Sequence, residues 1–169
     1  MIETKEGGGS MRKVLAFLSA LVLGVMVSVC SAGGVADKLM RDRDQLGLRL
    51  AEVASGVSSL ANMADRVKAG KEKQELMKRL ILLETEAFLL SEAFGKVDKI
   101  VFGIDVLASV VMSGAYLDSV NYEASASVFD KAVKDAEDVL RKLVDCSFCS
   151  VKTREVARQT LKDLRGWWR

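Results

Sequence analysis

The chain has 169 residues, of which 50% are hydrophobic and 28% charged, and its formal net charge is +2. This length fits one domain with short appendages, and the composition excludes disordered, collagen-like and disulfide-dense classes. The absence of proline favours long helices, and the absence of histidine removes the commonest general base and the commonest neutral metal ligand.

The first predicted element is an export signal over residues 11–32. Arg12 and Lys13 precede an almost wholly apolar stretch, residues 14–29, and small residues follow it. A cationic start, an apolar run and small residues together predict a secretory signal peptide of bacterial type. One alternative is a buried helix of the domain. Another is a retained membrane anchor, since the run falls just short of the ~20 residues that span a bilayer.

The ten residues before Met11 do not fit the start of such a signal, because they are polar and net acidic. We therefore expect the native product to begin at Met11 and residues 1–10 to be a non-native leader. An engineered Gly-Gly-Gly-Ser linker at residues 7–10 is the other explanation.

Two processing routes remain open for the signal segment. Cleavage after Ala32 places small residues at the positions that an ordinary signal peptidase reads. Residues 27–30, Val-Ser-Val-Cys, resemble a bacterial lipobox, although Val29 stands where that motif has Gly, Ala or Ser. This resemblance implies lipidation at Cys30, with Gly33 and Gly34 as a flexible tether.

The mature part, residues 33–169, is predicted to be one helical-bundle domain. Its apolar residues recur at steps of three and four, which keep side chains on one face of a helix, whereas a strand needs steps of two. Two such helices are expected over residues 46–67 and 76–94. Gly70 suits the helix end between them, and the short connection predicts an antiparallel hairpin.

A third helix is expected over residues 97–117, and it differs from the others because it has almost no polar face. Such a helix is either central in a bundle or within a membrane. Asp105 lies in its middle, which favours a buried helix with Asp105 hydrogen-bonded or at a solvent gap.

A turn near residues 118–121 offers capping residues for a fourth helix over 122–144. A shorter fifth helix is expected over 153–164. The predicted fold class is therefore all-α: an antiparallel bundle of four long helices plus a short C-terminal helix, preceded by the signal-peptide helix.

Cys146 and Cys149 form a Cys-Ser-Phe-Cys motif between the last two predicted helices. In an exported protein two neighbouring thiols usually oxidise, so a structural disulfide is the principal prediction. A redox dithiol and a pair that stays reduced are the alternatives. A metal site is not expected, because the chain has no histidine and no further mature cysteine to complete a tetrahedral set.

No catalytic or cofactor site is predicted anywhere in the chain. The sequence has no nucleophile-elbow, phosphate-loop or dinucleotide motif, and its carboxylates are mixed with Lys and Arg on polar helix faces. We therefore expect no enzyme activity and no cofactor. Nucleic-acid binding is not expected either, because the basic C-terminal stretch is short.

The C-terminal tail, residues 165–169, contains both tryptophans of the chain. We expect Gly166 to end the last helix and to leave a basic tail suited to contact a protein partner or lipid headgroups. The alternative is that one indole packs over the end of the bundle. The candidate contact residues are Arg165, Trp167, Trp168 and Arg169.

These features predict an exported, non-enzymatic protein of a bacterial envelope or surface that binds an unidentified protein partner. Periplasm, outer envelope and cell surface are all compatible locations, and the helical stripes permit oligomers. One alternative is a membrane-active protein or a membrane-anchored lipoprotein. Another is a periplasmic thiol-disulfide protein that uses Cys146 and Cys149.

Overall fold

The structure is a computed structural model that describes the backbone of residues 8–112 and 119–168 and the side chains of residue 34 and of residues 36–105 and 127–167. Within these ranges the chain forms four helices and no strand, so the predicted all-α class is confirmed. The helices are α1 (Gly8–Arg66), α2 (Lys71–Met112), α3 (Ser119–Asp145) and α4 (Val151–Trp168).

The chain divides into two units, Met1–Val35 and Ala36–Arg169, and α1 contributes to both. The predicted leader, signal peptide and lipidation site at Cys30 fall outside the residues whose side chains are described. These assignments therefore stay predictions, and the following description concerns the unit Ala36–Arg169.

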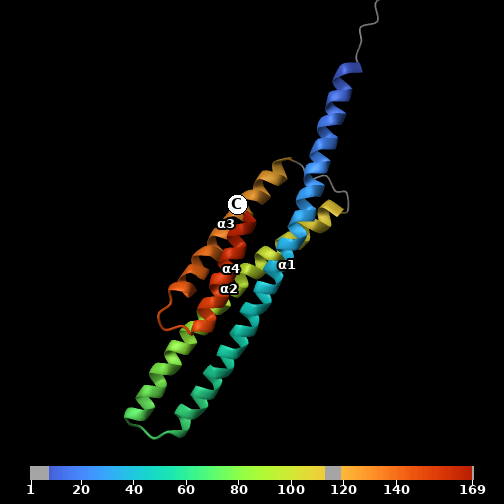
Figure 1. Cartoon of the computed structure of the whole chain (residues 1–169). Coiled ribbons are helices and arrows are strands. Elements are labelled where there is room, and N and C mark those ends of the chain that lie inside the picture. The colour runs from blue at the N-terminus through green and yellow to red at the C-terminus, as the bar shows by residue number, and fades with distance from the viewer. Residues whose placement is uncertain (1–7, 113–118, 169) are drawn as a thin grey trace, which may run out of the picture. The chain divides into compact units, whose positions relative to one another are not determined.

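The four helices run antiparallel to one another in this unit (Figure 1). Helices α1 and α2 are antiparallel, because later residues of α1 contact earlier residues of α2: Gly47 meets Phe94, and Gly56 meets Leu83. An added Cβ atom on Gly56 would lie 3.0 Å from a methyl carbon of Leu83. Side chains of α2 therefore pack against α1 where it carries glycine, and the predicted antiparallel hairpin is confirmed.

The two C-terminal helices complete the bundle. Lys96 of α2 pairs with Asp135 of α3, α3 packs along α4, and Arg49 of α1 donates a hydrogen bond to Thr153 of α4. Each helix thus contacts the next in the chain, and α4 returns to α1, which gives an up-down-up-down topology.

The predicted number of helices was wrong, because the segments 76–94 and 97–117 do not form separate helices. Through Met112 they are one helix, α2. Gly95 does not end it, because the buried positions continue at helical spacing from Leu90 through Val97 to Val101 on either side of this glycine. The bundle consequently has three long helices and the shorter α4, and residues 113–118 lie outside the described part.

The boundaries of the last two helices also differ from the prediction. Helix α3 begins at Ser119, inside the predicted turn, and α4 starts two residues earlier and ends four residues later than expected. Gly166 lies within α4, so the expectation that it ends the helix was wrong. A glycine inside a helix costs only about 1 kcal/mol, which packing of the neighbouring residues offsets.

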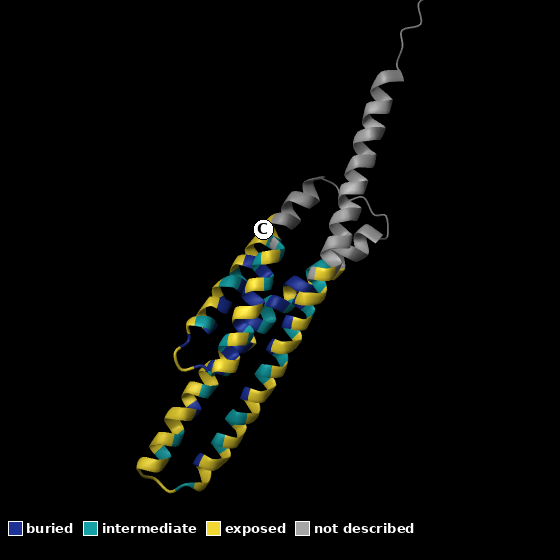
Figure 2. Ribbon diagram, viewed as in Figure 1, coloured by how far each residue is buried: buried dark blue, intermediate teal, exposed yellow. Residues whose placement is uncertain are grey.

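The core lies where all four helices meet (Figure 2). Leu46, Leu90, Leu140 and Leu164 are fully buried, one from each helix. Other residues of the predicted apolar stripes are buried as well: Val53, Leu80, Val133, Ala136, Val139, Leu143 and Leu161.

One sequence expectation about burial was wrong. Val128 shares the helical spacing of the apolar residues in the fourth predicted helix and was therefore expected to be buried, yet it is 70% exposed. Asp105 is exposed, which agrees with the expected position at a solvent gap. Both lie towards one end of the bundle, where an apolar residue or a carboxylate on a helix can face solvent.

The α1–α2 hairpin extends beyond the other two helices (Figures 1 and 2). The α3–α4 turn lies beside Glu86, and α4 runs from there away from the hairpin loop, reaching Asp42 of α1 with its Asp163. Residues 54–84 therefore form a two-helix segment, which we call the outer hairpin. The α1 part of the outer hairpin, residues 54–66, is about 20 Å long.

Candidate functional site

The turn between α3 and α4 contains the predicted disulfide, which joins Cys146 to Cys149. Both residues are buried, at 7% and 3% exposure, and the Cys149 amide donates to the sulfur of Cys146. Phe148 between them is 42% exposed. The disulfide thus closes a tight turn whose sulfur atoms face the bundle while its phenyl ring contacts solvent.

Ser150 follows the disulfide directly and caps the N-terminus of α4. Its carbonyl accepts the first helical hydrogen bond from the Arg154 amide at 3.1 Å, and its hydroxyl accepts from the Thr153 amide at 3.2 Å. Serine at this position satisfies an amide that has no partner in the helix itself.

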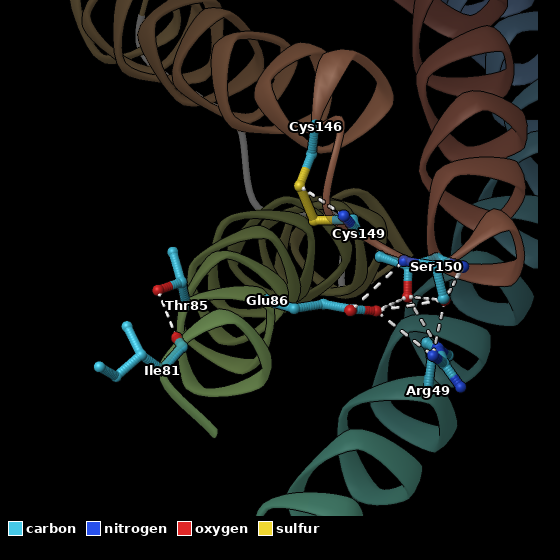
Figure 3. The surroundings of a disulfide bond; sticks show 8 residues. Arg49, Ile81, Thr85, Glu86, Cys146, Cys149 and Ser150 are labelled. Atoms are coloured by element: carbon cyan, nitrogen blue, oxygen red, sulfur yellow. Dashed lines mark hydrogen bonds and ion pairs between the residues drawn. A yellow bond between two sulfur atoms is a disulfide. The ribbon is translucent and has the colours of Figure 1, made fainter. Parts of the chain in front are cut away.

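Glu86 of α2 completes this cap from another helix (Figure 3). One carboxylate oxygen accepts from the Ser150 amide at 3.3 Å, and the other accepts from the hydroxyls of Ser150 and Thr153. In a local capping box, a glutamate three residues after the cap accepts from the cap amide. Here that position is Thr153, and Glu86 supplies the carboxylate, 3% exposed, at the positive end of the α4 dipole.

Arg49 of α1 supplies the positive charge for this cluster. Its guanidinium lies 3.3 Å from the Glu86 carboxylate and donates to Ser150 Oγ and Thr153 Oγ1, both at 2.7 Å. It also pairs at 2.8 Å with Glu52, whose pKa is lowered by hydrogen bonds from Lys152 and Arg49. We call Arg49, Glu86, Ser150 and Thr153 the capping cluster.

The capping cluster joins α1, α2 and α4 through hydrogen bonds. Each carboxylate oxygen of Glu86 accepts hydrogen bonds from within the bundle, and Thr153 is fully buried. A buried charge pair with complete hydrogen bonding is strongly destabilised when one partner is removed. The cluster therefore fixes the α3–α4 turn at one position along the hairpin.

A second buried carboxylate, Asp42 of α1, lies against α4. It is 8% exposed, and its Oδ2 atom has no hydrogen-bond partner within the described part of the chain. Burial, followed by the charge of Asp163 and a hydrogen bond with it, raises the pKa of Asp42 to about 6, although Arg41 and Lys38 oppose the shift. Asp42 therefore loses its proton less readily than an exposed aspartate.

The predicted C-terminal contact residues are partly built into the bundle. The ring of Trp167 meets Phe129 of α3 edge to face, with centroids 5.6 Å apart, and Arg165 lies 3.4 Å from Glu137. One indole thus packs over the end of the bundle, as the alternative expectation had it. Trp168 and Arg169 lie outside the residues whose side chains are described.

The outer hairpin leaves one helix face uncovered. Leu82 precedes Glu86 by one helical turn, so it lies on the α2 face that meets α4 further along. Met63 follows Glu52, which pairs with Lys152 of α4, by three turns of α1. Leu82 and Met63 are 46% and 51% exposed. We call the face that carries them the uncovered hairpin face.

Sequence reasoning found the disulfide but missed the capping cluster. Glu86 was treated as one of many solvated carboxylates, whereas it lies beside the apolar positions Leu83 and Leu90 at helical spacing. A carboxylate on the edge of such a stripe, together with the Ser-Val-Lys-Thr cap at residues 150–153, was the available signal.

Comparisons with family models, with curated proteins and with solved structures find no match for this chain. Among the described residues, no group of three or more potential ligand residues is placed to hold a metal ion. Within those same residues, no helix is both long enough and apolar enough to cross a membrane.

Proposed function

We propose that this chain is an exported, non-enzymatic bundle of a bacterial envelope or surface that works by binding a protein partner through the uncovered hairpin face. One observation carries the proposal. Helices α3 and α4 cover the α1–α2 hairpin only as far as the capping cluster, and beyond it Met63 and Leu82 are exposed. Large apolar side chains exposed together on a monomer are typical of interaction sites.

The partner is expected to present an amphipathic helix. A helix on the uncovered hairpin face would continue the four-helix packing past the α3–α4 turn, where Phe148 and Val151 are also exposed. Residues 65–79 at the hairpin tip contain six basic and three acidic residues. Acidic side chains beside the apolar stripe of the partner helix would complement this charge.

Burial of the cysteines supports a structural disulfide over a thiol-disulfide exchange protein. Exchange requires attack on an accessible sulfur, whereas Cys146 and Cys149 are both buried. The export part of the proposal is supported by the sequence of residues 11–32 alone. In the lipoprotein alternative the mature chain begins at Cys30 and carries an acyl chain there.

Site-specific photo-crosslinking in the native cell tests the binding proposal. A photoreactive residue at Leu82 or Met63 should give the same protein adduct, and one at Lys142, exposed on α3, should not. The substitution Leu82→Glu should abolish the adduct formed from position 63, because it places a carboxylate in the apolar contact.

Fractionation and intact mass measured on the same cells test export. The expected result is an envelope or surface product that has lost residues 1–32, or one that begins at an acylated Cys30. A full-length cytosolic product would contradict export, and equal crosslinking at position 142 would contradict the proposed binding face.

A further inference from the structure

A different face of α2 carries an exposed stripe at helical spacing. Its residues follow one another at steps of three and four, which is the spacing of a coiled-coil seam. They are Met77, Ile81, Glu84, Phe88, Ser91, Gly95, Lys99 and Phe102. We call this stripe the outer α2 face.

Among the residues whose side chains the structure describes, the outer α2 face is free of the other helices of the bundle. Leu83 and Phe94 face α1, whereas Lys96 and Gly103 face α3, and the stripe lies between these two directions around the helix. Phe88 and Phe102 are 67% and 69% exposed. Phenylalanine is rarely so exposed, so a stripe with two such rings indicates a contact surface.

The outer α2 face is complementary to itself in one antiparallel alignment. With the symmetry axis between Ser91 and Glu92, Phe88 of one copy lies opposite Gly95 of the other. An added Cβ atom on Gly95 would meet nothing within 4 Å, so there is open space for the ring. Ile81 lies opposite Phe102 in the same alignment.

Charge supports the same alignment. It places Glu84 of one copy opposite Lys99 of the other, and two-fold symmetry forms this pair twice. Both residues are exposed, and within the part of the chain that the structure describes neither has an ion pair. Large-to-small and opposite-charge matches therefore occur in a single register.

We propose that two copies of this chain associate through their outer α2 faces as an antiparallel two-fold dimer in this register. The contact is isologous, so it closes at two copies and does not propagate. It uses a face other than the uncovered hairpin face, which leaves each copy of the latter available to a partner. The dimer proposal therefore does not depend on the proposed function.

Charge exchange tests the register. The chain is measured by sedimentation equilibrium over a range of concentrations, with circular dichroism to confirm folding. Glu84→Lys and Lys99→Glu should each weaken the dimer by about tenfold or more, because like charges then face each other twice. The double variant should return to near the affinity of the unmodified chain, and Lys131→Glu on exposed α3 should change nothing.

Cysteine crosslinking tests the direction of the helices. Ser91→Cys lies next to the axis and should form a disulfide-linked dimer, whereas Glu84→Cys should not, since its symmetry mate lies about 22 Å along the helix. Both are made in the Cys30→Ser background. Glu92 flanks the axis in both copies, so Glu92→Gln should tighten the dimer.

A monomer at all concentrations, a dimer indifferent to both charge reversals, or efficient crosslinking through Glu84→Cys would each overturn the proposal.

Discussion

At the scale of single residues, the molecule depends on two buried carboxylates with opposite energetic consequences. Glu86 accepts hydrogen bonds at a helix N-terminus and faces Arg49, so removing its carboxylate would leave buried donors without an acceptor. Asp42 is buried against Asp163, so its charge is disfavoured. The two sites therefore predict opposite responses to neutral substitutions.

Glu86→Ala should lower the free energy of unfolding by about 3–5 kcal/mol, because Arg49 and the hydroxyls of the capping cluster lose their acceptor in a buried site. Urea denaturation measures the change. Glu155→Gln, exposed on α4, is the matched control and should lie within about 0.5 kcal/mol of the unmodified chain. A similar small effect for Glu86→Ala would contradict the structural role of the cluster.

Asp42→Asn should stabilise the chain at neutral pH by about 1–3 kcal/mol and have little effect near pH 4. The folded pKa of about 6 exceeds the unfolded value of about 3.9, so the folded state binds more protons between these values. Wild-type stability from this group is therefore present at low pH and lost as pH rises to about 6.

Urea denaturation of both proteins from pH 4 to 8 measures this difference. The control is Asp138→Asn, exposed on α3, whose difference from the unmodified chain should not vary in the same window. A constant difference for Asp42→Asn would show that Asp42 is not protonated in the folded state.

Residue-level features were the least predictable from sequence. The spacing of Glu86 places it at the edge of an apolar stripe, but its burial depends on where a turn 60 residues later is placed. Asp42 likewise lies beside Asp163, a residue 121 positions later in the chain. Cys146 and Cys149 were predictable because the disulfide is local, with three residues of separation.

At the scale of elements, the α3–α4 turn is held by the disulfide on one side and the capping cluster on the other. Reduction should lower the free energy of unfolding by about 2 kcal/mol, since the bond closes a four-residue loop. Hydrogen exchange should localise the loosening to the first turn of α4, where the Thr153 amide donates to Ser150.

Urea denaturation with and without dithiothreitol measures this effect. The double variant Cys146→Ser with Cys149→Ser should match the reduced chain and should no longer respond to the reductant. A response in that variant would assign the effect to Cys30 instead.

Helix positions were predictable where the pattern is amphipathic and a breaker is present. Gly70 follows Val67 at the end of a stripe, and the structure indeed ends α1 at Arg66 and begins α2 at Lys71. The join at Gly95 was not predictable from glycine alone, because the decisive feature is burial of Val97 and Ile100 against neighbouring helices. Tertiary packing overrides the low helix propensity of glycine.

At the scale of the whole bundle, stability is expected to be uneven along the hairpin. The four-helix part contains most of the buried side chains, whereas Ala64 and Leu80 are the buried residues among 54–84. Amides of residues 60–80 should therefore exchange with solvent at a lower opening free energy than those of residues 90–101. Native-state hydrogen exchange measures both, and equal protection would show that the bundle unfolds as one unit.

The position of the capping cluster also allows the length of the outer hairpin to change without changing the contacts that stabilise the four-helix part. Seven residues make about two turns of a helix. Inserting seven residues in α1 after position 54 and seven in α2 before position 84 would therefore keep the helical register. They would lengthen the projection by about 10 Å. Related chains are thus free to vary in span by paired insertions on the two limbs of the hairpin, while the clamp at Glu86 keeps the same neighbours.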